Sequence, residues 1–352
     1  MVEQMKFSGK KLLVVGGAGF VGSNLVELLL QHDPAQIVIV DNLLSSDPSN
    51  IPIDDRVHFV LGSIAEDSVL DQLPRDLAYV WHLACYHGNQ SSIQNPIEDH
   101  ANNTYTSLKL FDALSRFSGL EKVVYAAAGC AVAEKTFDDP AATPEDAPVS
   151  LFHDSPYSIS KLIGEFYGNY YYSRHGLPFV KARFQNVYGP REILGAGRWR
   201  GTVHTVWRNV TPTFVWKALH KEALGLDNGG HTSRDFIFVE DLVRGLMLCA
   251  AKGDAGEVYN LASGKETTIL HLAEMVNEIT GNTTEMVIQP VRDWDRSGRR
   301  FGATEKSEAH LSFRAGTEMR EGLRQTIEWT KNNQDRIQAC IDQHSYFMAK
   351  HA

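Results

Sequence analysis

The chain has 352 residues, 43% hydrophobic and 22% charged, and a formal net charge of -9. This composition is that of an ordinary globular protein, and the acidic balance argues against a general nucleic-acid or membrane-surface binder. No apolar run approaches the roughly 18 residues of a membrane span, and the first residues lack the apolar core of a signal peptide. The cysteines are too dispersed for a metal-type pair. We therefore expect a cytoplasmic protein with no metal site.

The first half of the chain alternates between short apolar runs and helical spacing. Residues 11–16 end at a glycine as a buried strand does, residues 20–31 have the apolar spacing of a helix, and residues 36–40 are a second β-branched run. The same reasoning predicts strands at 57–61, 77–83, 122–127 and 179–184, and helices at 102–117 and 157–172. This alternation predicts an α/β fold of the Rossmann type, with a doubly wound parallel sheet.

The alternation breaks after Gly189-Pro190. A loop rich in Gly, Arg and Trp follows, and later segments predict helices at 212–224, 268–280 and 318–332 and strands at 236–239 and 257–261. We therefore expect a smaller C-terminal lobe interleaved with the sheet. The expected division is a dinucleotide-binding domain at 1–188 with return segments near 235–262, a substrate lobe at 189–234 and 263–340, and a tail at 341–352.

A glycine loop joins the first predicted strand to the first predicted helix. Gly16, Gly19 and Gly22 have the spacing that allows a tight turn, close approach of a pyrophosphate and close helix packing. Asp41 ends the second strand about 20 residues further on, where an acid binds ribose hydroxyls and repels a 2′-phosphate. A glycine turn without a ligand is the alternative. The combination of strand, helix and acid predicts bound NAD rather than NADP.

Tyr157 and Lys161 are four residues apart in a predicted helix and share one face. A free phenol has a pKa of about 10, and a neighbouring lysine together with a positive nicotinamide ring favours the phenolate. Tyr157 would then take a proton from an alcohol while the nicotinamide takes a hydride. The same spacing is common on ordinary helices, but here it follows a strand that should end at the cofactor.

With these two motifs the chain resembles the extended short-chain dehydrogenase/reductases, and within them the nucleotide-sugar epimerase/dehydratase family that includes UDP-glucose 4-epimerase. The resemblance runs from about Lys11 to about Trp329. Beyond the motifs, it is carried by Trp81-His82-Leu83-Ala84, Ser92-Ile93-Gln94-Asn95-Pro96, Arg183-Phe184-Gln185-Asn186-Val187-Tyr188-Gly189-Pro190, Asn209-Val210-Thr211-Pro212, Arg234-Asp235-Phe236-Ile237-Phe238-Val239-Glu240-Asp241, Tyr259-Asn260-Leu261 and Thr326-Ile327-Glu328-Trp329.

The resemblance implies roles for particular residues. The expected NAD contacts are Gly16, Gly19, Phe20, Val21, Gly22, Asp41, Asn42, Ser63, Ile64, Leu83, Ala84, Asn103, Tyr157 and Lys161. The expected substrate contacts are His87, Ala128, Asn186, Asn209, Arg234 and Arg292. The two arginines offer forked donors to a diphosphate. Alternatives are a salt bridge for Arg234, a solvated charge cluster for Arg292 and a structural role for His87.

The chain departs from the family after its fifth predicted strand. Ala128 stands where the family usually has a serine or threonine that binds the oxygen at carbon 4. Gly129 and Cys130 stand where the 4,6-dehydratases carry an Asp-Glu pair, so dehydration is disfavoured, as is decarboxylation. Cys130 matches the position of an acid/base cysteine in related 3,5-epimerases, and a thiol pKa of about 8.5 suits that work. Simple packing of Cys130 is an equal alternative.

The expected function is NAD-dependent epimerisation at carbon 4 of a nucleotide-linked hexose, through a transient 4-keto sugar. Alternatives are epimerisation at carbon 3 or 5 with Cys130 as a catalytic residue beside Tyr157 and Lys161, net oxidation or reduction at carbon 4, or a non-catalytic NAD sensor. The resemblance also implies a homodimer in which the helices at 102–117 and 157–172 form a four-helix interface.

Overall fold

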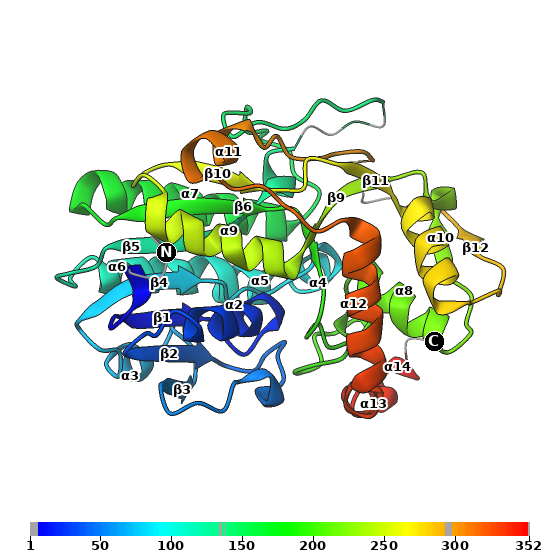
Figure 1. Ribbon diagram of the computed structural model, residues 1–352, viewed down its shortest axis with the longest axis horizontal. Coiled ribbons are helices and arrows are strands. Elements are labelled where there is room, and N and C mark those ends of the chain that lie inside the picture. The colour runs from blue at the N-terminus through cyan, green and yellow to red at the C-terminus, as the bar shows by residue number, and fades with distance from the viewer. Residues whose placement is uncertain (1–5, 134–135, 137, 293–297, 351–352) are drawn as a thin grey trace.

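The computed structural model describes residues 6–133, 136, 138–292 and 298–350 (Figure 1). The strands are β1 (Lys11–Val15), β2 (Gln36–Asp41), β3 (Val57–Leu61), β4 (Leu77–His82), β5 (Lys122–Ala128), β6 (Phe179–Phe184), β7 (Asn186–Tyr188), β8 (Gly225–Asp227), β9 (Ser233–Phe238), β10 (Val258–Leu261), β11 (Glu266–Thr268) and β12 (Val287–Gln289). The helices are α2 (Phe20–Leu30), α3 (Asp67–Leu70), α4 (Asn89–Gln94), α5 (Pro96–Asp99), the π-helix η2 (His100–Tyr105), α6 (Thr106–Leu114), α7 (Pro156–His175), α8 (Val210–Leu219), α9 (Val239–Lys252), α10 (Ile269–Thr280), α11 (Glu305–Leu311), α12 (Met319–Asn332), α13 (Gln334–Asp342) and α14 (Ser345–Met348).

A seven-stranded sheet forms the larger part of the molecule, in the order β10-β6-β5-β4-β1-β2-β3. Every neighbouring pair in it is parallel. The strand order reverses at β1, which pairs with β2 on one side and β4 on the other. The predicted doubly wound Rossmann-type sheet is confirmed, and ligands of such sheets bind beyond the carboxyl ends of the strands at this reversal.

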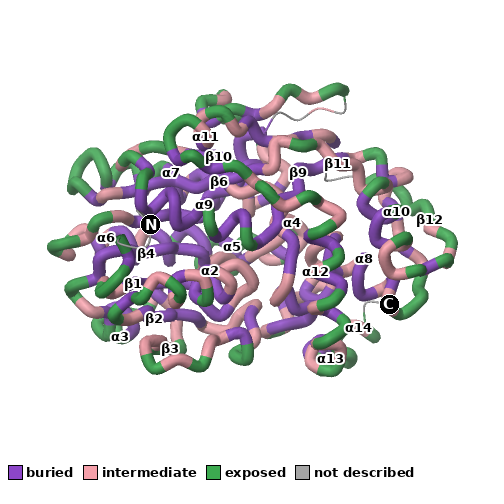
Figure 2. The backbone as a smooth tube through the Cα atoms, viewed as in Figure 1, coloured by how far each residue is buried: buried purple, intermediate pink, exposed green. Residues whose placement is uncertain are grey.

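Helices cover both faces of the sheet because its strands are apolar on both sides. Leu12 and Val14 of β1 belong to one buried cluster with residues of α2 and α9, whereas Leu13 and Val15 belong to a second cluster with Leu110 of α6 and residues of α7. Figure 2 shows the buried residues following the sheet and the inner sides of these helices. Removal of this apolar surface from water supplies the main driving force for the fold.

Helix α7 lies unusually close to the sheet because two of its sheet-facing positions are glycines. A Cβ atom at Gly164 would lie 2.1 Å from the hydroxyl oxygen of Tyr125, and one at Gly168 would lie 2.0 Å from the ring of Phe179. Both aromatic rings are buried. The absence of side chains at these two positions thus sets the distance between α7 and the strands β5 and β6.

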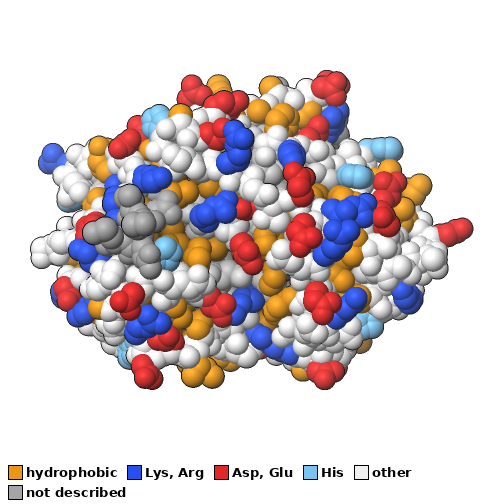
Figure 3. All heavy atoms as spheres, in the orientation of Figure 1, with side chains coloured by type: hydrophobic (Ala, Val, Ile, Leu, Met, Phe, Trp, Pro, Cys, Tyr) orange, Lys and Arg blue, Asp and Glu red, His pale blue; other side chains and the backbone are white. Residues whose placement is uncertain are grey.

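The smaller lobe lies beside the carboxyl ends of the sheet and contains short strands and α8, α10 and α12 (Figure 1). Strand β7 pairs in parallel with β9, β9 pairs antiparallel with β11, and β12 pairs with β8. A separate apolar cluster that includes Phe214, Leu272 and Leu323 holds the lobe together. On the face in Figure 3 acidic and basic side chains are interspersed.

The predicted elements differ from the observed ones where the sequence signal is short or irregular. The helix predicted at 102–117 consists of η2 followed by α6, and its first residues have the wider π turn. Strands β7, β8, β11 and β12 have three residues each, too few for a recognisable pattern. Within the expected tail, α14 contributes Phe347, whose ring stacks on Trp199 at 5.2 Å. No helix in the described part of the chain is long and apolar enough to span a bilayer.

Candidate active site

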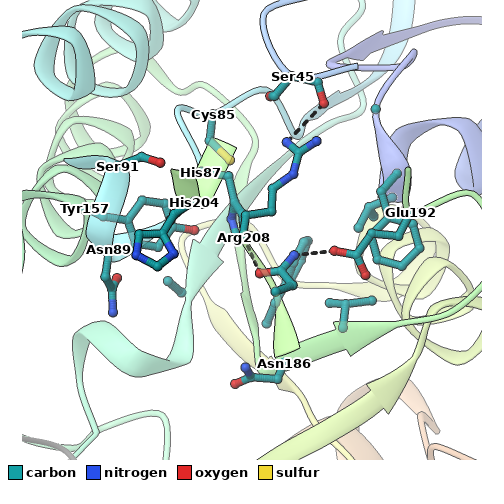
Figure 4. Close-up of a pocket in the computed structure, with 18 of the residues that line it drawn as sticks. Ser45, Cys85, His87, Asn89, Ser91, Tyr157, Asn186, Glu192, His204 and Arg208 are labelled. Atoms are coloured by element: carbon teal, nitrogen blue, oxygen red, sulfur yellow. Dashed lines mark hydrogen bonds between the residues drawn. The ribbon is translucent and has the colours of Figure 1, made fainter. Parts of the chain in front are cut away.

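A cavity of about 560 Å³ lies between the carboxyl ends of the sheet strands and the smaller lobe. Residues from the glycine loop, the ends of β4 and β5, the start of α7 and the lobe all line it. Figure 4 shows part of this wall, in which the Arg208 side chain extends toward Ser45 and donates to its carbonyl oxygen. The geometry brings together motifs that are nearly 300 residues apart in sequence.

The glycine loop forms one end of the cavity. Gly16 has φ +84°, and a Cβ atom there would lie 2.6 Å from the backbone nitrogen of Ala84. At Gly22 a Cβ atom would lie 2.1 Å from the carbonyl oxygen of Gly16. Helix α2 begins after Gly19 without a side-chain cap, so its first N–H groups face the cavity end as an anion site. The loop has the form that a pyrophosphate requires.

Asp41 lies at the end of β2 and lines the same end of the cavity. One carboxylate oxygen accepts hydrogen bonds from the Leu43 N–H at 2.9 Å and the Ser46 hydroxyl at 2.8 Å, and the other accepts from the Ala18 N–H at 3.1 Å. Burial raises the pKa of Asp41, and these donors act in the opposite direction. These donors hold the Asp41 carboxylate in place at this end of the cavity.

Tyr157 and Lys161 lie in the first turns of α7. Ser155 caps this helix through its hydroxyl, and the Ser92 hydroxyl accepts a hydrogen bond from the Tyr157 N–H at 3.1 Å. Lys161 is 3% exposed, its ammonium donates to the Ala126 carbonyl at 2.8 Å, and it lies 5.7 Å from the centre of the Tyr157 ring. Burial raises the pKa of Tyr157 well above its ordinary value. The phenol therefore depends on nearby positive charge to lose its proton.

A chain of polar contacts joins the sheet side of the cavity to the lobe. The His87 ring lies edge-on to the Tyr157 ring at 5.8 Å, and its Nε2 contacts the Asn209 side-chain oxygen at 3.0 Å. The Asn209 amide in turn donates to the carboxylate of Glu192. Burial lowers the pKa of His87 to about 4, so its imidazole is neutral near pH 7. His87 thus positions the lobe residue Asn209 without carrying charge.

Two arginines, the buried Arg200 and the partly buried Arg208, lie beside this polar chain. Arg200 donates to the His87 carbonyl at 2.7 Å and lies over the Tyr86 ring, and burial lowers its pKa to about 9. Arg208 donates to the carbonyl oxygens of Ser45 and Ile193. Burial raises the pKa of Glu192 and lowers the pKa of Arg208.

The lobe contributes Asn186, Arg234 and Arg292 to the far end of the cavity. Arg234 donates to the carbonyl oxygens of Ser233 and Gly298, while the neighbouring Asp235 accepts from Ser263 and Gly264. Arg292 forms an ion pair with Asp227, and both residues line the cavity. These cationic side chains line the same cavity as the glycine loop, although they come from elements distant from it in sequence.

The departures from the family pattern lie in the same wall as Tyr157. Ala128 is the last residue of β5, Gly129 begins the short turn η3 (Gly129–Ala131), and both Ala128 and Cys130 line the cavity. Cys130 packs in a small apolar cluster with Ala131, Leu162 and Tyr157. The wall has a methyl group where the family's hydroxyl would project.

The structure places all but one of the predicted site residues on the cavity wall. Asn103 lies behind it: its side-chain oxygen accepts from the Tyr86 N–H at 2.6 Å, and its amide donates to Asp99 at 2.8 Å and Ser160 at 3.1 Å. Sequence reasoning missed Ser91, Gln185, Glu192, Arg208 and Arg300, all of which line the cavity. Isolated polar residues in loops and short helices carry no sequence pattern that distinguishes them from surface residues.

Comparisons with known proteins agree with this geometry. A model of the family described as "NAD dependent epimerase/dehydratase family" matches residues 12–262. The Bordetella bronchiseptica enzyme WbmF, solved in complex with NAD+, is 53% identical, with a TM-score of 0.88 and coverage of 98% of this chain and 99% of that chain. The same enzyme has also been solved with NAD+ and UDP.

Two further relatives are more distant. A structure of an epimerase from Methanothermobacter thermautotrophicus is 36% identical, with a TM-score of 0.88 over 96% of this chain and 97% of that one. The UDP-glucose 4-epimerase of Mycolicibacterium smegmatis is 28% identical over 92% of this chain and 99% of its own length.

Proposed function

The chain belongs to the NAD-dependent epimerase/dehydratase family, and we propose that it is a nucleotide-sugar epimerase that inverts carbon 4 of a hexose through a transient 4-keto sugar. The observation that carries the proposal is the presence of Tyr157 and Lys161 in one cavity with the glycine loop. The similarity to a UDP-glucose 4-epimerase and to the methanogen epimerase supports it.

The residues of the glycine loop fit NAD. At Gly16 and Gly22 the backbone packs too closely for any side chain, which keeps the loop in its tight turn, and the N-terminus of α2 offers N–H groups to the pyrophosphate. Asp41 would bind the ribose hydroxyls and disfavour a 2′-phosphate. We assign the remaining cofactor contacts to Phe20, Val21, Asn42, Ser63, Ile64, Leu83 and Ala84. When bound, NAD supplies the hydride acceptor and later returns the hydride.

Tyr157 moves the proton in this proposal. Its phenolate takes the proton of the hydroxyl at carbon 4 as that carbon is oxidised, and the phenol returns a proton when the carbon is reduced. The ammonium of Lys161 lies 5.7 Å from the centre of the Tyr157 ring, and a positive charge at that distance favours the phenolate. Asn103 acts indirectly, because its hydrogen bonds to Asp99, Ser160 and the Tyr86 backbone hold the wall behind the site.

The lobe would hold the nucleotide and leave the sugar free to turn. We assign Asn186, Asn209, Arg234 and Arg292 to the nucleotide diphosphate, because they lie on the lobe side of the cavity and include two forked cations. WbmF has been solved with UDP, which supports a uridine nucleotide here. In the division that we propose, residues 1–188 with the return near 235–262 hold the cofactor and residues 189–234 and 263–340 hold the substrate. Asn186 is the exception, because β7 pairs with the lobe strand β9 and so places this residue on the substrate side.

The test is incubation of the purified protein with UDP-, GDP-, CDP- and dTDP-hexoses in deuterated water, followed by NMR and mass spectrometry. Inversion at carbon 4 without deuterium on the ring supports the proposal, and a Tyr157→Phe variant should then lose about 100-fold or more in kcat. Near-full turnover by Tyr157→Phe contradicts the mechanism.

Cys130 favours a second candidate function, because it lines the cavity and packs near Tyr157. As an acid/base it would exchange protons at carbon 3 or 5, next to the transient ketone. Deuterium at either carbon, lost in a Cys130→Ser variant, would favour this reaction over simple 4-epimerisation.

We also propose a homodimer formed through α7 and its neighbouring helices. Ile159, Phe166 and Tyr170 are 46%, 56% and 52% exposed and lie along one side of α7. Ile97 of α5 and Tyr105 of η2 are also exposed, and both of these elements pack against α7. Aromatic side chains of this kind are enriched in interfaces. Light scattering should give twice the chain mass, and a Phe166→Asp, Tyr170→Asp variant should give the monomer. A monomeric wild type contradicts this assembly.

A further inference from the structure

The cavity wall beside Tyr157 has a methyl group at Ala128, where the family usually has a hydroxyl group, and a neighbouring side chain offers a hydrogen-bond donor instead. Ala128 presents only a methyl group to the cavity. Oxidation or reduction at a sugar carbon changes the charge on its oxygen, and a positioned hydrogen-bond donor stabilises that change. Another donor in the same wall would therefore serve the reaction that we have proposed.

Gln185 lies next to this position in the sheet. Ala128 is the register partner of Phe184 in the parallel pair β5–β6, and Gln185 is the residue that follows. A Cβ atom built on Gly129 would lie 2.2 Å from Nε2 of Gln185, and one built on Gly302 would lie 2.9 Å from the same nitrogen. The carboxamide thus occupies space that two glycines leave open.

The carboxamide of Gln185 is available to a ligand. Gln185 lines the cavity and is only partly buried, and within the described residues its amide makes no hydrogen bond. A carboxamide has two N–H donors and an acceptor oxygen, and it does not titrate. It can therefore stabilise charge on a substrate oxygen without competing with Tyr157 for the proton.

We propose that Gln185 is a substrate-contacting residue whose amide donates a hydrogen bond to the oxygen on the carbon that is oxidised, in place of the hydroxyl that Ala128 lacks. The proposal rests on oxidation at carbon 4 as the function of this site. It also explains Gly129, because any side chain there would displace the Gln185 amide from the wall.

The test compares single-turnover reduction of the bound cofactor by a nucleotide hexose in four variants. Gln185→Ala should slow reduction about 10- to 100-fold with little change in substrate affinity, because the bond strengthens as charge develops on the oxygen. Gly129→Ala, which displaces the amide, should slow it to a similar degree. The double variant Gln185→Ala, Ala128→Ser should reduce the cofactor at least about tenfold faster than Gln185→Ala alone, because the serine hydroxyl supplies a donor in the same wall.

Ser91→Ala tests the other candidate donor. Ser91 lines the cavity, and its Oγ is buried with no hydrogen-bond partner among the described residues, so it could bind the same substrate oxygen. A loss of rate in Ser91→Ala with none in Gln185→Ala overturns the proposal. So does a loss in Gln185→Ala that Ala128→Ser fails to restore while thermal melting shows both variants folded.

Failure of the proposed function has a different signature. If a nucleotide hexose reduces the cofactor of the wild type but carbon 4 is not inverted, the proposed epimerase activity is wrong. The rates of the Gln185 variants still test the role of Gln185 in that case. If no nucleotide hexose reduces the cofactor, both fall together.

Discussion

Gly168→Ala tests whether the close approach of α7 to the sheet positions Tyr157 and Lys161, the pair that we propose to be catalytic. The new Cβ atom would lie 2.0 Å from two carbons of the Phe179 ring, which is fully buried. Ordinary carbon contacts are about 3.5–4.0 Å, so helix and ring must separate by about 1.5 Å. Overpacking of this kind costs about 1–3 kcal/mol of unfolding free energy.

The same displacement should reach the site, because Lys161 on α7 donates to Ala126 of β5 at 2.8 Å. A shift of about 1 Å in a positioned group can lower a rate by about 100-fold. We therefore expect Gly168→Ala to lose stability in urea unfolding and to lose up to about 100-fold in kcat.

Gly176→Ala is the matched control at the end of the same helix. Gly176 has φ +69° and nothing lies within 4 Å of a Cβ atom built on it, so the change adds only backbone strain of about 1–2 kcal/mol. Its kcat should stay at the wild-type value. Wild-type stability and kcat in Gly168→Ala would refute the reasoning, and equal kcat losses in both variants would point to general destabilisation instead.

Three further predictions concern the charged groups. Burial raises the pKa of Tyr157, and only the phenolate accepts a proton, so kcat should rise with pH. Lys161→Met removes a positive charge near the phenol and should move this rise to higher pH. An unchanged pH profile of kcat in Lys161→Met would contradict the role of Lys161. Glu165 and Arg183 form a bidentate salt bridge with bonds of 2.9 and 2.8 Å, and both side chains are 6% exposed. Glu165→Ala leaves the arginine charge buried and unpaired, so it should lower the free energy of unfolding in urea by about 3–5 kcal/mol, whereas the double variant Glu165→Leu, Arg183→Met should recover most of that loss. Equal losses in the single and the double variant would contradict an unpaired charge as the cause. Asp41→Ala should weaken NAD binding about 10- to 100-fold in calorimetry and should reduce the ratio of the affinity for NAD to that for NADP. An unchanged affinity for NAD would show that Asp41 does not bind the ribose.

Local patterns in the sequence carried much of the fold and part of the site. The strand–helix alternation up to residue 184 predicted the parallel sheet, because buried strands and amphipathic helices have characteristic apolar periods. The glycine loop, Asp41 and the Tyr157–Lys161 pair were recognisable because each is a short motif at a fixed spacing. In the lobe, three-residue strands such as β8 and β12 left no such pattern.

What the sequence by itself determined is therefore what lies within one element or one turn: the parallel sheet, the glycine loop and the helix face that carries Tyr157 and Lys161. The tertiary structure alone decided which distant residues meet, as when His87 contacts Asn209 and Asn209 contacts Glu192. It placed Asn103 behind the cavity wall and Gln185 over Gly129. The physical reason is that such contacts depend on strand register, helix packing distance and the volume left by glycines, which arise only when the elements pack together.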